Sequence, residues 1–247
     1  MKTKFYILIA ALALMVTSAS ASCDDSTKRA HTMDIKFNDQ GFHYWEGLDI
    51  GVNGYLNVKN SIATPETYSF LELDYARSRS FAWNVGQRNF HIYKNYINLV
   101  TGVGFEWTSY AFKQNITLNT DVNMISATND SIDFTKNKLK STWVKAPLML
   151  EFNTSKDEDK SFHIGVGAEV GYNIFRNRQK QEFMMFGEEQ KRKNKDDFNL
   201  NPFRCSLVAR VGFGKYTVFA NYGLSEVFKS GQGPKVYPFS AGINIHL

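Results

Sequence analysis

Residues Phe162 to Phe175 alternate between apolar side chains and side chains that are polar or glycine. Successive side chains of a β-strand point to opposite faces, so this strand needs an apolar medium on one face and tolerates water or charge on the other. Fourteen residues exceed the soluble strand of about 5 to 6. They suit a tilted strand that crosses a bilayer, which takes roughly 9 to 11 residues. The alternation therefore predicts a transmembrane strand.

Seven further stretches alternate in the same way, at residues 47–53, 71–76, 97–107, 144–152, 206–213, 216–224 and 237–247. Eight strands give the even number that single-chain bacterial barrels require. Beyond the N-terminal region no segment approaches the ~18 apolar residues of a membrane helix, and an open sheet would leave unpaired backbone groups in lipid. The sequence predicts an all-β fold, an eight-stranded antiparallel up-and-down transmembrane β-barrel.

The expected connections alternate between long and short. Residues 113–138 and 176–202 are long connections, whereas Gly214-Lys215 is minimal. This pattern predicts long loops outside the cell, short turns in the periplasm and both termini in the periplasm. Residues 86–95 are long for a periplasmic turn and leave the second strand's boundaries open. Pro147 removes a ladder hydrogen bond, so we expect a β-bulge there.

The N-terminus has the order of a secretory signal. Lys2 and Lys4 precede an apolar run, which ends in Ala19-Ser20-Ala21. We predict a signal peptide at residues 1–21, a periplasmic segment at 22–44 and a barrel domain at 45–247. Lipidation of Cys23 stays open, although Ser20 replaces the large aliphatic residue normally found three positions earlier. The predicted location is the outer membrane of a Gram-negative cell envelope.

Composition narrows the classes of partner. The formal charge of +5 falls to +3 without Lys2 and Lys4, which is too small to indicate nucleic acid. An aromatic fraction of 15% agrees with the interfacial girdles of membrane barrels. No metal-ligand spacing or phosphate loop is present, so we expect no cofactor.

Several motifs resemble the PorT-like outer-membrane β-barrel family. They are Tyr93–Tyr96, Leu99–Trp107, Ala146–Phe152, Asp197–Arg204 and Tyr237–Phe239, and the likeness extends from about Trp45 to Leu247. The resemblance implies a barrel and no catalytic residues. Because the founding member is tied to a protein-secretion apparatus, it also implies an alternative function in secretion or transport across the outer membrane. The final residue is Leu247, where such barrels usually end in an aromatic.

Strand parity places both signs of charge inside the barrel. An eight-stranded interior is only wide enough for side chains, and unpaired charges there cost several kcal/mol each. We therefore predict a structural network of ion pairs across the lumen; a narrow proton or ion path is the alternative. The predicted members are Asp49, Glu72, Asp74, Glu106, Lys145, Glu151, Glu169, Arg204 and Arg210.

A lipid-modifying or proteolytic enzyme is a second alternative. His163 and His246 are inward by parity but lie near the expected periplasmic ends, whereas Ser109 and Ser225 lie toward the outer ends. No nucleophile motif such as G-x-S-x-G occurs. We expect no enzymatic activity.

The longest predicted loop contains a cationic cluster, Lys191, Arg192, Lys193 and Lys195. Such residues could contact lipopolysaccharide phosphates or another envelope protein, although flanking carboxylates lower the local charge. A soluble lipocalin-like barrel, with the apolar face inward, is the alternative fold. The preferred hypothesis is a barrel with a filled lumen that acts in the bilayer as a structural or interaction component.

Overall fold

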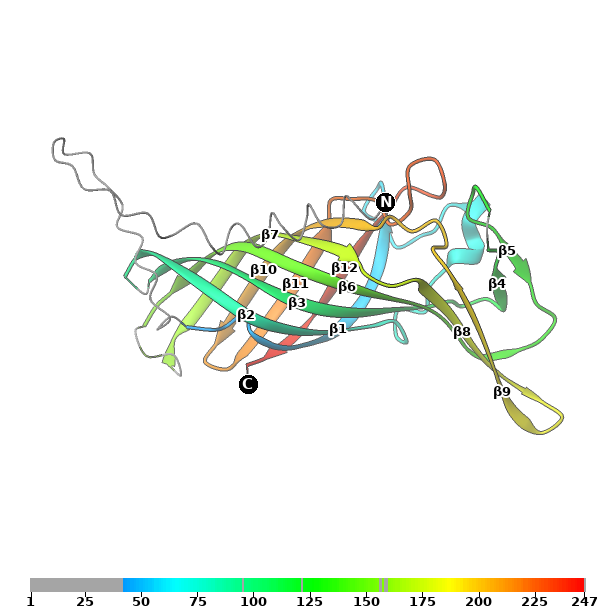
Figure 1. Ribbon diagram of the computed structural model, residues 1–247, viewed down its shortest axis with the longest axis horizontal. Coiled ribbons are helices and arrows are strands. Elements are labelled where there is room, and N and C mark those ends of the chain that lie inside the picture. Colours follow the sequence, from blue (N-terminus) through cyan, green and yellow to red (C-terminus); the bar gives the residue numbers. More distant parts are fainter. Residues whose placement is uncertain (1–41, 95, 121, 156, 158–159, 247) are drawn as a thin grey trace. The chain divides into compact units, whose positions relative to one another are not determined.

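A computed structural model of the protein describes residues 42–94, 96–120, 122–155, 157 and 160–246 (Figure 1). The predicted signal peptide, Cys23 and Leu247 lie outside these residues. Eight of the described strands, the ring strands, are β1 (Gly47–Asn57), β2 (Arg79–Tyr93), β3 (Ile97–Ala111), β6 (Phe134–Asn153), β7 (Phe162–Asn173), β10 (Phe203–Phe213), β11 (Tyr216–Gly223) and β12 (Val236–Ile245). The other described elements are η1 (Glu66–Leu71, a 3-10 helix), β4 (Ile116–Leu118), β5 (Ala127–Asn129), β8 (Asn177–Met185) and β9 (Glu188–Asp196).

Each ring strand pairs antiparallel with the next ring strand along the chain, and β12 pairs back with β1. In the closing pair, for example, Val52 lies opposite Ala241. The pairings therefore form a closed ring through eight strands. They confirm the predicted all-β antiparallel architecture.

The two ends of the ring differ in their connections. The near end is the one at which β1 begins and β12 ends; residues 94–96, 154–161 and 214–215 form its short connections. The far end carries the long connections at residues 58–78, 112–133, 174–202 and 224–235. The predicted alternation of long and short connections is confirmed.

The outward face of the ring is apolar. Its exposed side chains, which we call the apolar belt, are Ile50, Val52, Phe81, Trp83, Leu148, Leu150, Val166, Val170, Leu207, Val211, Val218 and Ile243. Most of the alternate positions are buried, polar and inward. A soluble monomer rarely exposes an apolar surface of this extent. The lipocalin-like alternative, with its apolar face inward, is therefore wrong.

The far-end connections fold into structure of their own (Figure 1). β4 and β5 form a two-stranded sheet, and β8 and β9 form a hairpin that continues the ring sheet from β6. The hairpin turns at Phe186-Gly187, where both φ angles are positive (52° and 83°). The expected long loop at residues 176–202 is therefore largely a β-hairpin. Its strands alternate little in hydropathy, so the sequence did not reveal them.

The predicted second strand at residues 71–76 is wrong. Leu71 ends η1, and Leu73 makes only an isolated bridge to Phe112. Both leucines are buried in a far-end apolar core, so their alternation reflects packing between loops and not contact with lipid. The second ring strand is β2, and a short connection at 94–96 replaces the expected long turn.

The β-bulge expected at Pro147 is also wrong. Pro147 lies opposite Glu169 in an unbroken β6–β7 register, and the β3–β6 register is the same on both sides of it. Thr101 Oγ1 donates a hydrogen bond to the Pro147 carbonyl (2.9 Å). The missing N–H of Pro147 therefore removes one hydrogen bond from the ladder but does not shift the register of the strands. A register shift instead occurs in β2, where Gly86 has a φ of 63°.

Candidate functional site

The lumen contains a buried ion-pair network around Asp49. Arg210 Nη2 lies 2.7 Å from Asp49 Oδ2, and Lys145 Nζ lies 3.2 Å from the same oxygen. Lys145 also lies 3.3 Å from Glu169 Oε2, and Asn244 donates to Asp49 Oδ1 (2.8 Å). The four charged side chains are at most 4% exposed. They come from β1, β6, β7 and β10, so the network ties strands across the ring.

A second buried pair joins Glu106 of β3 to Arg204 of β10. The Arg204 guanidinium also lies 4.8 Å from the Trp143 ring centroid, where a cation and an aromatic face attract each other. This pair crosses the lumen nearer the far end. Each charge again has an opposite charge, as a low-dielectric interior requires.

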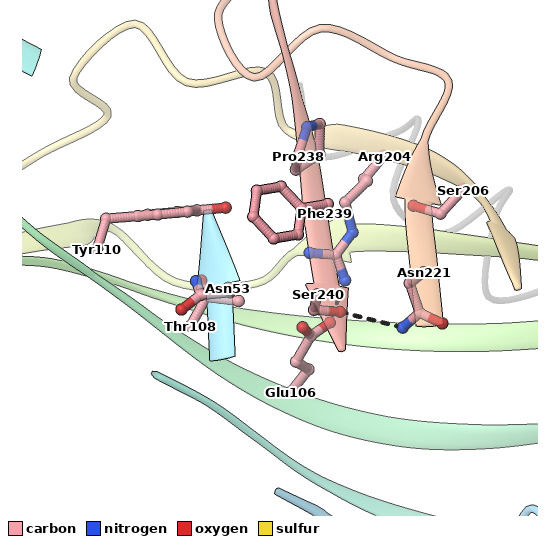
Figure 2. A pocket seen from close by; sticks show the side chains of 10 residues that line it. All are labelled: Asn53, Glu106, Thr108, Tyr110, Arg204, Ser206, Asn221, Pro238, Phe239 and Ser240. Carbon is pink, nitrogen blue, oxygen red and sulfur yellow. Dashed lines mark hydrogen bonds and ion pairs between the residues drawn. The ribbon is translucent and has the colours of Figure 1, made fainter. Parts of the chain in front are cut away.

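A polar pocket surrounds the Glu106–Arg204 pair (Figure 2). Asn53, Asn221 and Ser240 converge on it from separate strands, and Asn221 donates to Ser240 Oγ (3.3 Å). The cavity that the pocket leaves between side chains is small, about 10 Å³. Asn221 Oδ1 is buried in this pocket and accepts no hydrogen bond from the residues that the structure describes. Buried polar groups of this kind are commonly satisfied by water, and a cavity of about 10–15 Å³ holds one molecule, so the pocket suits about one water molecule.

The near end is filled by residues 42–46, which we call the near-end plug. Gln87 Oε1 accepts hydrogen bonds from the backbone N–H groups of Trp45 (2.9 Å) and Glu46 (3.0 Å), and its amide donates to the Phe42 carbonyl (2.9 Å). Trp45 is 1% exposed, and Tyr44 stacks on His163 with centroids 3.8 Å apart. The shift in β2 aims Gln87 inward to hold this segment. The predicted boundary at residue 45 therefore cuts through the plug.

The far end is covered by an apolar core. Inward side chains at the ends of the ring strands, such as Tyr55, Tyr110 and Leu139, pack against Phe198 and other residues of the long connections. These connections therefore pack over the lumen as folded structure.

Asp197 accepts hydrogen bonds from Lys229 Nζ (2.5 Å) and the Asn199 N–H (2.9 Å) beside this core. Partial burial raises the pKa of Asp197, but these bonds and the Lys229 charge outweigh it and hold the pKa below its ordinary value.

The structure brings six of the nine predicted lumen charges together in ion pairs inside the lumen: Asp49, Glu106, Lys145, Glu169, Arg204 and Arg210. A seventh, Glu151, is buried and accepts a hydrogen bond from Asn153 (3.0 Å). Glu72 and Asp74 lie outside the ring strands, because the strand predicted there does not form; Glu72 pairs with Lys113 (2.5 Å) and Asp74 with Arg77 (3.4 Å), both with partly exposed side chains. Their assignment to the lumen is wrong.

Sequence reasoning missed the near-end plug. Trp45 and Gln87 do not belong to an alternating apolar pattern that could mark them. Gly102 was a signal that could have been used, because a Cβ at this position would lie 2.5 Å from the Trp45 ring.

The predicted cationic cluster lies on β9. Arg192 Nη1 pairs with Asp130 (2.9 Å), and Lys191 Nζ lies 3.6 Å from Glu189. The side chains of Lys193 and Lys195 are exposed. The four cations therefore do not act as one group, because Arg192 lies on the opposite face of the hairpin from the three lysines.

The residues weighed for catalysis do not converge. His163 is buried against Tyr44, and its Nε2 lies 2.7 Å from Thr217 Oγ1. His163 therefore lies at the near end of the ring, whereas Ser225 lies in a far-end connection. Ser225 accepts a hydrogen bond from the Cys205 N–H (3.0 Å). Within the described residues, no cluster of His, Cys, Asp and Glu is suited to a metal ion, and no helix is long and apolar enough to cross a membrane.

Comparisons with known proteins give one family match. The model described as "Outer membrane protein beta-barrel domain" matches residues 35–229. No curated protein matches the chain. Among solved structures, the crystal structure of Ail, the attachment invasion locus protein of Yersinia pestis, is similar at 16% identity and a TM-score of 0.30, covering 81% of this chain and 98% of that one.

Proposed function

The chain belongs to the outer membrane protein beta-barrel domain family, and from this premise we propose that it is a non-conducting barrel that holds a folded far-end surface at the outer face of the outer membrane. The eight ring strands are the transmembrane segments. The apolar belt meets the lipid, and the inward charges never do.

The observation that carries the proposal is the filled lumen. The network around Asp49 and the Glu106–Arg204 pair occupy its middle, the near-end plug fills one end and the far-end core covers the other. An ion on its way through would have to break buried pairs, and removal of one partner costs about 3–5 kcal/mol. The lumen therefore supports a structural role for its charges and no proton or ion path.

The direction of the barrel in the membrane follows from its connections. Outer-membrane barrels have short periplasmic turns and longer extracellular loops. The near end is accordingly periplasmic, and the far end with η1, β4, β5 and the β8–β9 hairpin is extracellular. This orientation places both ends of the ring, Gly47 and Ile245, on the periplasmic side.

Two measurements on the refolded mature chain test this proposal. A barrel should migrate faster on a gel before boiling than after it and show a β-rich circular dichroism spectrum. Planar bilayers should show no more conductance with the protein than without it. A protein that stays soluble without detergent, or one that opens stable channels, would overturn the proposal.

The alternative is a PorT-like component of secretion across the outer membrane. It is favoured by β9, which pairs only with β8 and so has an unpaired edge within the described sheet. Such an edge accepts an extended chain of another protein. Deletion of residues 180–193 should then abolish secretion in cells while the barrel still assembles. We propose no enzymatic activity, in keeping with the separation of His163 from Ser225.

A further inference from the structure

The outward face of the sheet beyond the apolar belt carries six cations in two rows. In one row Lys140 of β6 lies opposite Arg178 of β8, which lies opposite Lys195 of β9. In the next row Lys138, Lys180 and Lys193 are paired in the same way. We call these six residues the cationic array. All six share one face of the sheet, because side chains two residues apart on a strand and directly opposite on neighbouring strands point the same way.

The array is compact and poorly neutralised. Neighbouring strands lie about 4.8 Å apart, and residues i and i+2 are separated by about 6.6 Å, so six charges share an area of roughly 10 by 7 Å. Glu182 lies 3.8 Å from Lys180 Nζ but is held more closely by Lys136 (2.5 Å). Within the described part of the chain, the other five cations have no carboxylate at ion-pair distance.

The electrostatics of Lys138 show the crowding. Lys138 lies six residues beyond Val144, outside the apolar belt. The cationic side chains of Lys140, Arg79, Lys136 and Arg77 surround that of Lys138, so its ammonium group is repelled by like charges on several sides. An anion on this face would relieve that repulsion.

The array begins where the apolar belt ends. The row of Lys140 continues across Ser109 of β3 to Arg79 of β2. The next row along the strands includes Phe81 of the belt, and the outward rings of Phe81 and Trp107 lie 5.6 Å apart there. Outward aromatic side chains mark the interfaces of membrane barrels. The cations therefore lie just beyond this interface, at the depth of lipid head groups.

We propose that the cationic array binds phosphate groups of outer-leaflet lipids, with the acyl chains of the same lipid against the apolar belt. This inference rests on the proposed function, because it needs the far end to face outward. Charge-assisted bonds from Lys and Arg to phosphate supply the attraction, and the adjoining belt selects a lipid over a soluble anion. The array retains Lys193 and Lys195 from the cluster predicted on sequence and adds cations of β6 and β8.

The test compares lipids that differ only in phosphate. The chain is refolded in neutral detergent and titrated with bisphosphorylated or dephosphorylated lipid A, and bound lipid is counted by native mass spectrometry. The triple variant Lys140→Gln/Arg178→Gln/Lys195→Gln removes one row of the array. The control, Lys59→Gln/Lys215→Gln/Lys235→Gln, removes the same charge from exposed positions outside it.

Each cation near an anionic lipid surface contributes about fivefold to binding, so the array variant should bind bisphosphorylated lipid A on the order of 100-fold more weakly. The control should bind like the original chain, and dephosphorylated lipid A should bind weakly to all three. Equal losses in both triple variants, or equal binding of the two lipids, would overturn the inference. So would full displacement of the lipid by inorganic phosphate or an acidic peptide at equal concentration.

The same preparations are tested for the gel shift and for conductance. A heat-sensitive, non-conducting barrel that binds the two forms of lipid A equally would refute lipid binding by the cationic array. That result would leave the proposed function intact. A chain without the gel shift would refute the proposed function itself.

Discussion

Replacement of Asp49 by asparagine should strongly destabilise the barrel. Asp49 Oδ2 is shared by Arg210 and Lys145 at 2.7 and 3.2 Å, and both cations are buried. Lys145 keeps Glu169 as a partner, but Arg210 has no other carboxylate at ion-pair distance among the described residues. Loss of one partner from a buried pair costs about 3–5 kcal/mol, since the remaining charge stays desolvated. We expect Asp49→Asn to lower the free energy of unfolding by this amount.

The assay is urea unfolding of the protein refolded in lipid vesicles, followed by tryptophan fluorescence and by the gel shift. Glu72→Gln is the matched control, because the Glu72–Lys113 pair has half-exposed side chains and such pairs contribute about 0–1 kcal/mol. The double variant Asp49→Asn/Arg210→Met removes both charges and should regain much of the loss. If Asp49→Asn costs no more than Glu72→Gln, or if the double variant is worse than Asp49→Asn alone, the reasoning is refuted.

Three further predictions concern the plug and the far end. Gly102→Val should destabilise the barrel by about 1–3 kcal/mol through overpacking, because its Cβ would overlap the Trp45 ring; an unchanged urea midpoint and Trp45 fluorescence would contradict this. The lowered pKa of Asp197 means that its contribution to stability is present above the ordinary carboxyl pKa and is lost as pH falls through the folded-state value. The urea midpoints of the original chain and Asp197→Asn should therefore differ at neutral pH and converge in acid, and a constant difference would speak against the ion pair. Phe186→Ser, at a fully exposed hairpin tip, should change stability by less than about 0.5 kcal/mol, whereas Phe198→Ala, 1% exposed, should cost about 3–5 kcal/mol; similar urea midpoints for the two variants would show that the far-end core is not packed.

Alternation located seven of the eight ring strands because the lipid-facing and lumen-facing environments of a barrel differ so strongly. The same signal failed at Leu71 and Leu73, since a buried loop core also accepts every second side chain. The second ring strand, β2, has the same alternation: Phe81 and Trp83 are exposed and apolar, and they alternate along the strand with the buried polar residues Ser80 and Asn84. Two-residue periodicity shows that the two faces of a strand lie in different environments. It does not show whether lipid or protein covers the apolar face.

Strand parity predicted correctly that most of these charged side chains lie in the lumen. Once a strand is known, the position of a residue along it determines which face its side chain is on. Partners across the ring depend on register and shear, which set Lys145 beside both Asp49 and Glu169. The cationic array shows the same limit. Lys136, Lys138 and Lys140 alternate visibly in the sequence, but their juxtaposition with Arg178 and Lys195 arises only when the β8–β9 hairpin pairs with β6.

The plug and the charge network stabilise one another. Lys145 Nζ lies 5.9 Å from the Trp45 ring centroid, while its charge is balanced by Asp49 and Glu169. A cation that is already paired is fixed in position, so it presents a rigid surface to the indole at little further entropic cost. Trp45 in turn excludes water from the ion pairs, and an ion pair in a drier site is electrostatically stronger. Opening the near end would therefore weaken the pairs in the middle of the lumen, which is why we expect the barrel to stay closed as a unit and not to gate from one end.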